Sequence, residues 1–316
     1  MGITRYIIVR IFALIPVMLL VSLMIFSILH LIPGDPIDAI LGEQNDPVVR
    51  EALIKEFGFD KPLPFQFTLW LWKVLQGDFG ISIIAQREVK YELLERLPAT
   101  LYLAVIAVVL STFFAVPLGV IAAVKRKTMS DYMAMTSALL GVSIPEFWFG
   151  ILLVLLFSLK LGWLPTMGYV SPFQNFWVSL RHLVMPAVTL GWGMMAIVTR
   201  MTRSTMLDEL NKDYVRTARS QGLPERTIVY KLTLKNALIP TVTIVGMRFA
   251  TLLGGTVIVE SLFNWPGVGL LVLQSIYFRD YPVVQASVLI LATGFVVMNL
   301  LVDIIYTWLD PRVRLT

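Results

Sequence analysis

The sequence predicts an all-α integral membrane protein with six transmembrane helices, both termini in the cytoplasm, and a small, mostly helical outer cap between spans one and two. Of the 316 residues, 57% are hydrophobic and 15% are charged, whereas soluble domains contain about 45–50% and about 25%. Long apolar stretches recur along the chain, and basic residues concentrate in alternate connecting segments. These observations exclude an ordinary soluble domain.

Six apolar stretches are long enough to cross a bilayer, because a hydrocarbon core about 30 Å thick requires roughly 20 residues in a helix. They are residues 11–32, 100–124, 133–159, 182–199, 237–259 and 283–302. Prolines fall within them at positions 16, 117, 145, 186 and 240. We expect these prolines to bend the spans without ending them, because neighbouring helices can satisfy the freed backbone groups.

The first stretch shares one feature with a secretory signal peptide, since Arg5 and Arg10 precede it. However, Pro33-Gly34-Asp35-Pro36 follows it in place of a small-residue cleavage site. We therefore interpret residues 1–32 as a cytoplasmic N-terminus and a retained first span.

The distribution of basic residues sets the orientation. Bases occupy alternate segments, namely Arg5 and Arg10, Lys125, Arg126 and Lys127, those between residues 200 and 235, and Arg312 and Arg314. The short segments on the other side contain only Lys160, Arg181 and Arg279. The positive-inside rule therefore places both termini in the cytoplasm, including the tail at 311–316. The net charge of +5 reflects this orientation, so it requires no nucleic-acid partner.

Residues 33–98 form the long outer segment. Apolar residues recur at helical spacing in 48–57 and 67–75, and glycines and prolines separate these pieces. We expect a small helical cap, which serves either as a structural lid over the bundle or as a docking platform for an external partner.

Residues 99–310 form the five-span core, which includes a cytoplasmic segment at 208–235. Within it, Gly222 is expected to end one short helix, and Pro224 followed by Glu225 to begin another. Ala218 and Gly222 are four residues apart and would allow close approach by another protein. The alternative is an amphipathic helix that rests on anionic membrane lipid through basic residues such as Arg216.

This cytoplasmic segment carries a family resemblance. Tyr214-Val215-Arg216-Thr217-Ala218-Arg219-Ser220-Gln221-Gly222 resembles the coupling motif of permease subunits from ABC importers of the dipeptide, oligopeptide and nickel group. Other fragments typical of these permeases follow the same order along the whole chain. They are Pro33-Gly34-Asp35-Pro36, Gly77-Asp78-Phe79-Gly80-Ile81-Ser82, Ser143-Ile144-Pro145-Glu146-Phe147-Trp148, Asn236-Ala237-Leu238-Ile239-Pro240, Gly254-Gly255-Thr256-Val257-Ile258-Val259-Glu260, Asn264-Trp265-Pro266-Gly267-Val268-Gly269 and Arg279-Asp280-Tyr281-Pro282.

The resemblance implies a bacterial cytoplasmic (inner) membrane protein that assembles with a homologous second permease subunit, two cytoplasmic ATPase subunits and an extracytoplasmic solute-binding protein. ATP and magnesium would bind to the ATPase subunits, and this chain would hold no cofactor and no catalytic residue. In agreement, the sequence contains no Gly-Lys pair and therefore no phosphate loop. The implied coupling residues are Tyr214, Arg216, Thr217, Ala218, Arg219 and Gly222. The family motif at the outer end of span five comprises Gly254, Gly255, Glu260, Trp265, Pro266 and Gly267.

Charged residues at membrane depth are candidates for the translocation path, because each costs about 2.5–3.5 kcal/mol on insertion scales. Helix rise places Glu146 and Arg248 at similar depths near the midplane, so the two could pair. Ser143 and Pro145 adjoin Glu146 and complete the candidate path. Glu260 lies near a span end, where we expect a structural role.

The predicted function is a permease subunit of an ATP-driven importer of peptides, with nickel chelates and glutathione-like tripeptides as alternative substrates. An ion-coupled carrier would need several midplane acids and an inverted repeat, which the sequence lacks. A membrane-embedded enzyme would need a nucleophile, a base or a metal site. With no cysteine and two histidines, the chain offers no metal cluster of the usual kind.

Overall fold

The computed structural model describes residues 3–31, 47, 50–51, 54 and 60–309. This part of the chain is helical apart from turns, loops and one isolated bridge between Ile81 and Glu88. The named helices, with η for π-helical segments, are α1 (Ile3–Leu31), α4 (Leu63–Leu75), α5 (Val89–Val124), α6 (Met129–Ser143), α7 (Glu146–Leu153), η1 (Val154–Lys160), α8 (Phe176–Leu210), α9 (Asp213–Ser220), α10 (Glu225–Thr227), η2 (Ile228–Thr233), α11 (Leu234–Leu262), α12 (Val268–Tyr277) and α13 (Tyr281–Leu309).

Four of these helices are long and apolar enough to cross a membrane among the residues that the structure describes. They are α5, α8, the continuous stretch Glu225–Gly254, and the part of α13 from Tyr281 to Ile304. The bent pair Met129–Ser143 and Glu146–Lys160 makes a fifth if it is counted as one span. Helix α1 has 29 residues, but its apolar stretch Phe12–Ser27 is shorter than these candidate spans.

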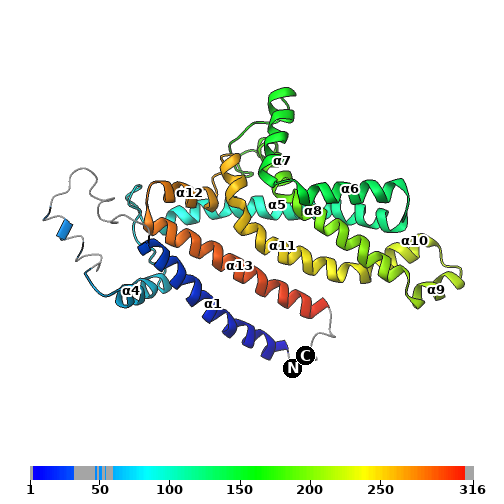
Figure 1. The fold of residues 1–316 in the computed structure, drawn as a ribbon, viewed down its shortest axis with the longest axis horizontal. Helices are drawn as coiled ribbons and strands as arrows, with labels where there is room; N and C mark the ends of the chain where they lie inside the picture. The colour runs from blue at the N-terminus through cyan, green and yellow to red at the C-terminus, as the bar shows by residue number, and fades with distance from the viewer. Residues whose placement is uncertain (1–2, 32–46, 48–49, 52–53, 55–59, 310–316) are drawn as a thin grey trace.

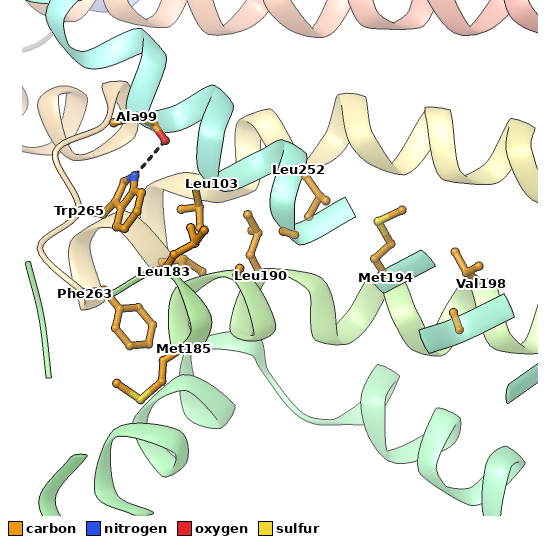
Figure 2. Close-up of a cluster of buried hydrophobic side chains, with 14 residues drawn as sticks. Ala99, Leu103, Leu183, Met185, Leu190, Met194, Val198, Leu252, Phe263 and Trp265 are labelled. Carbon is orange, nitrogen blue, oxygen red and sulfur yellow. Dashed lines mark hydrogen bonds between the residues drawn. The ribbon is translucent and has the colours of Figure 1, made fainter. Parts of the chain in front are cut away.

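The long helices run side by side, with α4 and α12 at one end of the bundle and α9 and α10 at the other (Figure 1). We call these the α12 end and the α9 end. Helices α5, α8 and α11 meet in the core, where Leu103, Leu183, Leu190 and Trp265 are buried (Figure 2). Helix α1 packs along α13, and an Arg10–Asp303 ion pair of 3.3 Å joins them.

The prediction that prolines would not end the helices is confirmed at four positions and wrong at the fifth. Prolines 16, 117, 186 and 240 lie inside α1, α5, α8 and α11, respectively. At Pro145, however, α6 ends and α7 begins, and the two segments diverge by 107°. Ile144 is extended, with ψ of 123°, because the residue before a proline is disfavoured in helical conformation.

The boundaries of the outer segment also differ from those predicted. Helix α5 begins at Val89, so the last ten residues assigned to the cap belong to a long helix. The helix predicted at 67–75 is present as α4, and it lies beside the end of α1 (Figure 1). An aromatic contact between Phe26 and Phe67, with centroids 5.5 Å apart, holds it there. The piece predicted at 48–57 falls largely outside the described residues.

Candidate functional site

The α9 segment has the predicted helix-break-helix form. Gly222 has φ of +74° and follows the last turn of α9. Its N–H donates to the Arg219 carbonyl at 3.0 Å, and the Leu223 N–H donates to the Ala218 carbonyl at 3.2 Å. These two bonds form a Schellman helix end, which favours glycine because L side chains rarely adopt positive φ. Pro224 then precedes α10.

Burial within this segment corrects the role predicted for Ala218. Its side chain is 4% exposed and packs with Val215 and Ile228 in a small apolar cluster. The small size of Ala218 therefore has an internal cause, since Ile228 occupies the adjacent space. Gly222 is exposed, and a Cβ added to it would meet nothing within 4 Å. Of the two small residues, only Gly222 is open to a partner.

Polar contacts fix the α9 segment between α8 and α11. The Tyr214 hydroxyl donates to Glu209 Oε2 at 2.8 Å and accepts from Asn236 Nδ2 at 3.3 Å. Burial raises the pKa of Tyr214, so this hydroxyl stays protonated. Arg219 pairs with Glu225 across the break, with Nε 2.8 Å from Oε1. These contacts make the segment a compact projection attached to both long helices.

All of the predicted coupling residues except Ala218 are exposed at the surface of this projection. Arg216 pairs with Asp213, and both side chains are largely exposed. Thr217 is exposed, and its hydroxyl donates to the Asp213 carbonyl at 3.1 Å. The surface open to a partner therefore includes Arg216, Thr217, Arg219, Gly222 and Leu223.

The break between α6 and α7 positions the predicted path residues Ser143, Pro145 and Glu146. Glu146 is the first residue of α7 and is partly buried. Its Oε1 lies 3.2 Å from the position that a Cβ on Gly193 would occupy, so the carboxylate rests against α8. Ser143 is exposed, and its hydroxyl donates to the Leu139 carbonyl at 2.9 Å. The break therefore puts a carboxylate at the junction of three helices.

Glu146 and Arg248 do not form an ion pair in this structure; both lie among the described residues. A Cβ added to Gly150 of α7 would lie 2.7 Å from Leu262 of α11 and 2.9 Å from Thr189 of α8. These three residues therefore lie at the same depth in the bundle. Glu146 lies about one turn inward of Thr189, whereas Arg248 lies about four turns inward of Leu262. The expectation of similar depths fails because the chain turns at Pro145. Arg248 is instead exposed on α11.

Glu260 lies in a polar cluster at the α12 end that we call the Glu260 knot, together with Thr100, Gly267, Val268 and Leu270. Glu260 is 0% exposed. Its carboxylate accepts from Thr100 Oγ1 at 2.7 Å and from the Leu270 N–H at 2.9 Å. Thr100 Oγ1 in turn accepts from the Val268 N–H at 2.8 Å. The Glu260 side chain thus caps the start of α12, where the helix dipole favours an acidic group.

The position of Glu260 also explains why the motif has glycine at residue 267. A Cβ on Gly267 would lie 2.2 Å from a Glu260 oxygen, so any side chain there would displace the carboxylate. Trp265 is also 0% exposed, and its Nε1 donates to the Ala99 carbonyl at 2.9 Å (Figure 2). The expected structural role of Glu260 is confirmed, and it extends to Trp265 and Gly267. Gly254, by contrast, is exposed, with nothing within 4 Å of an added Cβ.

Asp131 and Asp280 are buried acidic residues to which the sequence analysis assigned no role. Asp131 pairs with Arg203 between α6 and α8. Asp280 is 2% exposed and accepts from Ser82 Oγ at 2.5 Å, which joins the loop before α5 to the start of α13. Both acids lie at helix starts, Asp131 in the first turn of α6 and Asp280 immediately before α13, where an acid is also common as a simple helix-start residue. Their distant partners leave no signal in one sequence.

Comparisons with known proteins agree with this arrangement. Residues 115–315 match the family described as binding-protein-dependent transport system inner membrane component, and residues 3–104 match the corresponding N-terminal family. The glutathione transport system permease protein GsiC of Escherichia coli (strain K12) is 41% identical over 310 residues, covering 98% of this chain and 99% of the relative. GsiC of Pectobacterium atrosepticum is 42% identical over the same shares.

A solved structure shares the fold. A chain of the MetNI methionine ABC transporter, from a study of its inward-facing conformations, has a TM-score of 0.57 at 20% sequence identity. The match covers 70% of this chain and 97% of that chain. At this identity the likeness bears on the fold alone. The family matches and the glutathione permease relatives show that this chain belongs to the inner-membrane components of binding-protein-dependent transport systems, as a multi-pass, non-enzymatic permease subunit of an ABC importer.

Proposed function

We propose that this chain and a homologous sister permease form the translocation path for peptides, including glutathione-like tripeptides, delivered by a solute-binding protein. Family membership implies ATPase and binding-protein partners, and permease subunits themselves bind no cofactor. We further propose that two ATPase subunits bind ATP and magnesium. This chain itself would have six spans, with both termini in the cytoplasm. Support for a peptide substrate comes from the relatives named as glutathione permeases.

The observation that carries this proposal is the compact α9 projection at one end of the bundle. It is anchored to α8 through Tyr214 and Glu209 and to α11 through Asn236. Because it joins two of the long core helices, a force applied to it tilts both of them. ATP-driven closure of the ATPase pair would push on this projection and open the path to one side of the membrane and then the other.

A substitution at Gly222 tests docking of the ATPase. Gly222→Trp adds bulk at the exposed break, and it should abolish transport and uncouple ATP hydrolysis by blocking close approach. Gly162→Trp is a matched control, because Gly162 also has positive φ, +65°, and nothing within 4 Å of an added Cβ. Normal substrate-stimulated ATPase activity in Gly222→Trp would refute the proposed contact.

The path itself would run along the exposed face of α11 and past the α6–α7 break. Arg248 is exposed on α11, and a cation at membrane depth requires water, substrate or a partner subunit. Glu146 lies at the break with no ion pair among the described residues. With Ser143 and Pro145, these residues offer opposite charges at two depths, which suits a zwitterionic peptide that passes them in turn.

Substitution of both charges tests the path. Glu146→Gln and Arg248→Gln should each reduce transport, and the double variant should lose the sum of the two effects because the groups do not touch. Unchanged uptake in both single variants would exclude the two residues from the path.

Competition assays distinguish the possible substrates. Peptides and glutathione should displace a labelled peptide from uptake, whereas nickel chelates should not. The opposite pattern would favour the nickel alternative.

A further inference from the structure

The structure contains a partly buried ion pair between α6 and α8 to which the proposed function assigns no role. Arg203 Nε lies 2.6 Å from Asp131 Oδ1, and Nη2 lies 2.8 Å from Oδ2. The Asp131 side chain is 4% exposed and that of Arg203 is 25% exposed. The Lys127 N–H also donates to Asp131 Oδ2 at 3.0 Å. Two parallel charged hydrogen bonds of this kind fix both distance and orientation.

The pair holds the start of α6 to α8 at the α9 end of the bundle. Toward the break, α6 touches α8 through small residues, because a Cβ on Gly141 would lie 2.7 Å from Ala196 Cβ. Between these points the packing is incomplete: α5, α6 and α8 line a small pocket, open on one side, whose wall includes Ser137, Trp192 and Thr199. Apolar contact alone would let α6 shift across such a seam, whereas the ion pair resists it.

A continuous chain of contacts links this pair to both functional regions. Helix α8 carries Arg203 and, two turns later, Glu209, which binds Tyr214 of α9. Helix α6 carries Asp131 at its start and leads directly to the break at Pro145 and to Glu146. Motion of the α9 projection therefore reaches α8 first, and the ion pair carries it to the start of α6, which leads to the break.

We propose that Asp131 and Arg203 are positioning residues that make α6 move with α8, so that displacement of the α9 projection is transmitted to the α6–α7 break and to Glu146. The inference rests on the proposed function. It predicts a specific defect, in which ATP hydrolysis continues while transport is lost. A purely structural pair would instead lower the yield of folded complex and scale both activities together.

The test measures ATP hydrolysed per substrate transported by the complete complex in proteoliposomes. Asp131→Asn keeps the shape and removes the charge, and it should raise this ratio about tenfold, the equivalent of one charged hydrogen bond. Glu95→Gln is the matched control, because Arg87 binds Glu95 through two bonds of 3.1 and 2.8 Å at the α12 end. The control should leave the ratio unchanged.

Further variants keep the test decisive. If Asp131→Asn yields no intact complex, Arg203→Lys provides the test. Lysine keeps the positive charge but cannot form the two parallel hydrogen bonds that arginine makes to the carboxylate. Exchange of the two residues should restore part of the coupling. An unchanged ratio in Asp131→Asn, or in Arg203→Lys where only that complex forms, overturns the inference. Absence of ATP-dependent transport by the unmodified complex would count against the proposed function instead.

Discussion

Thr100→Val should destabilise this permease strongly although it changes only one hydroxyl for one methyl group. Thr100 is 1% exposed and connects two parts of the Glu260 knot. Its hydroxyl donates to Glu260 at 2.7 Å and accepts from the Val268 N–H at 2.8 Å. Valine has nearly the same shape, so the substitution removes both bonds without creating a cavity.

The expected loss follows from the two bonds. A hydrogen bond to a charged group contributes about 1.5–3 kcal/mol, and a buried donor left without a partner costs about 1–3 kcal/mol. Because the two effects share one hydroxyl and are not fully additive, we expect a loss of about 2–5 kcal/mol. At about 2 °C per kcal/mol for a chain of this size, the unfolding midpoint should fall by at least about 4 °C.

The assay is thermal unfolding of the purified chain in detergent, followed by intrinsic tryptophan fluorescence. Thr112→Val is the control, because Thr112 lies on the same helix and its buried hydroxyl has no hydrogen-bond partner. This control should leave the midpoint unchanged or raise it, since it removes an unsatisfied group. Equal midpoints for the two variants would show that the hydroxyl of Thr100 contributes no stability, and the reasoning would fail.

Three further predictions use the same structure. Gly267→Ala should lower the free energy of unfolding by about 1–3 kcal/mol through overpacking against Glu260. Gly254→Ala should instead stabilise the isolated chain by about 0.5–1 kcal/mol. Thermal unfolding of both variants checks this, and equal effects would contradict it. Cysteine at Ala85 should react with an impermeant maleimide in intact spheroplasts and cysteine at Ser220 only after lysis, with no background because the chain has no cysteine; the reverse pattern would invert the topology. Glu146→Gln should reduce uptake without lowering the unfolding midpoint, because no bond is lost; a marked fall in the midpoint would indicate a structural role.

Hydropathy and turn chemistry predicted much of the fold, but a proline followed by an acid was interpreted as a helix start at only one of the two sites where it occurs. Pro224 followed by Glu225 predicted a helix start, and the structure has one there. Pro145 followed by Glu146 is the same pattern, and α7 begins there. The continuous apolar stretch around Pro145 favoured a bend, since prolines inside membrane helices are often tolerated. The acid directly after the proline was the available signal.

Contacts between distant segments account for the rest. The length of chain between Thr100 and Glu260, or between Asp131 and Arg203, leaves no periodic pattern that would link them. Ala218 was assigned to a partner contact because small residues permit close approach, yet Ile228 of the same segment fills that space. A single sequence shows that a residue is small or charged, and only the fold shows which neighbour requires it.

Reconstituted uptake tests the central claim most directly. The chain and its sister permease are placed in proteoliposomes with the solute-binding protein outside and ATP inside, with or without the ATPase subunits. A permease without its own ATPase site should import labelled peptide only when the ATPase subunits and ATP are both present. Concentrative uptake by the permease chains alone, driven by an ion gradient and indifferent to ATP, would contradict the account.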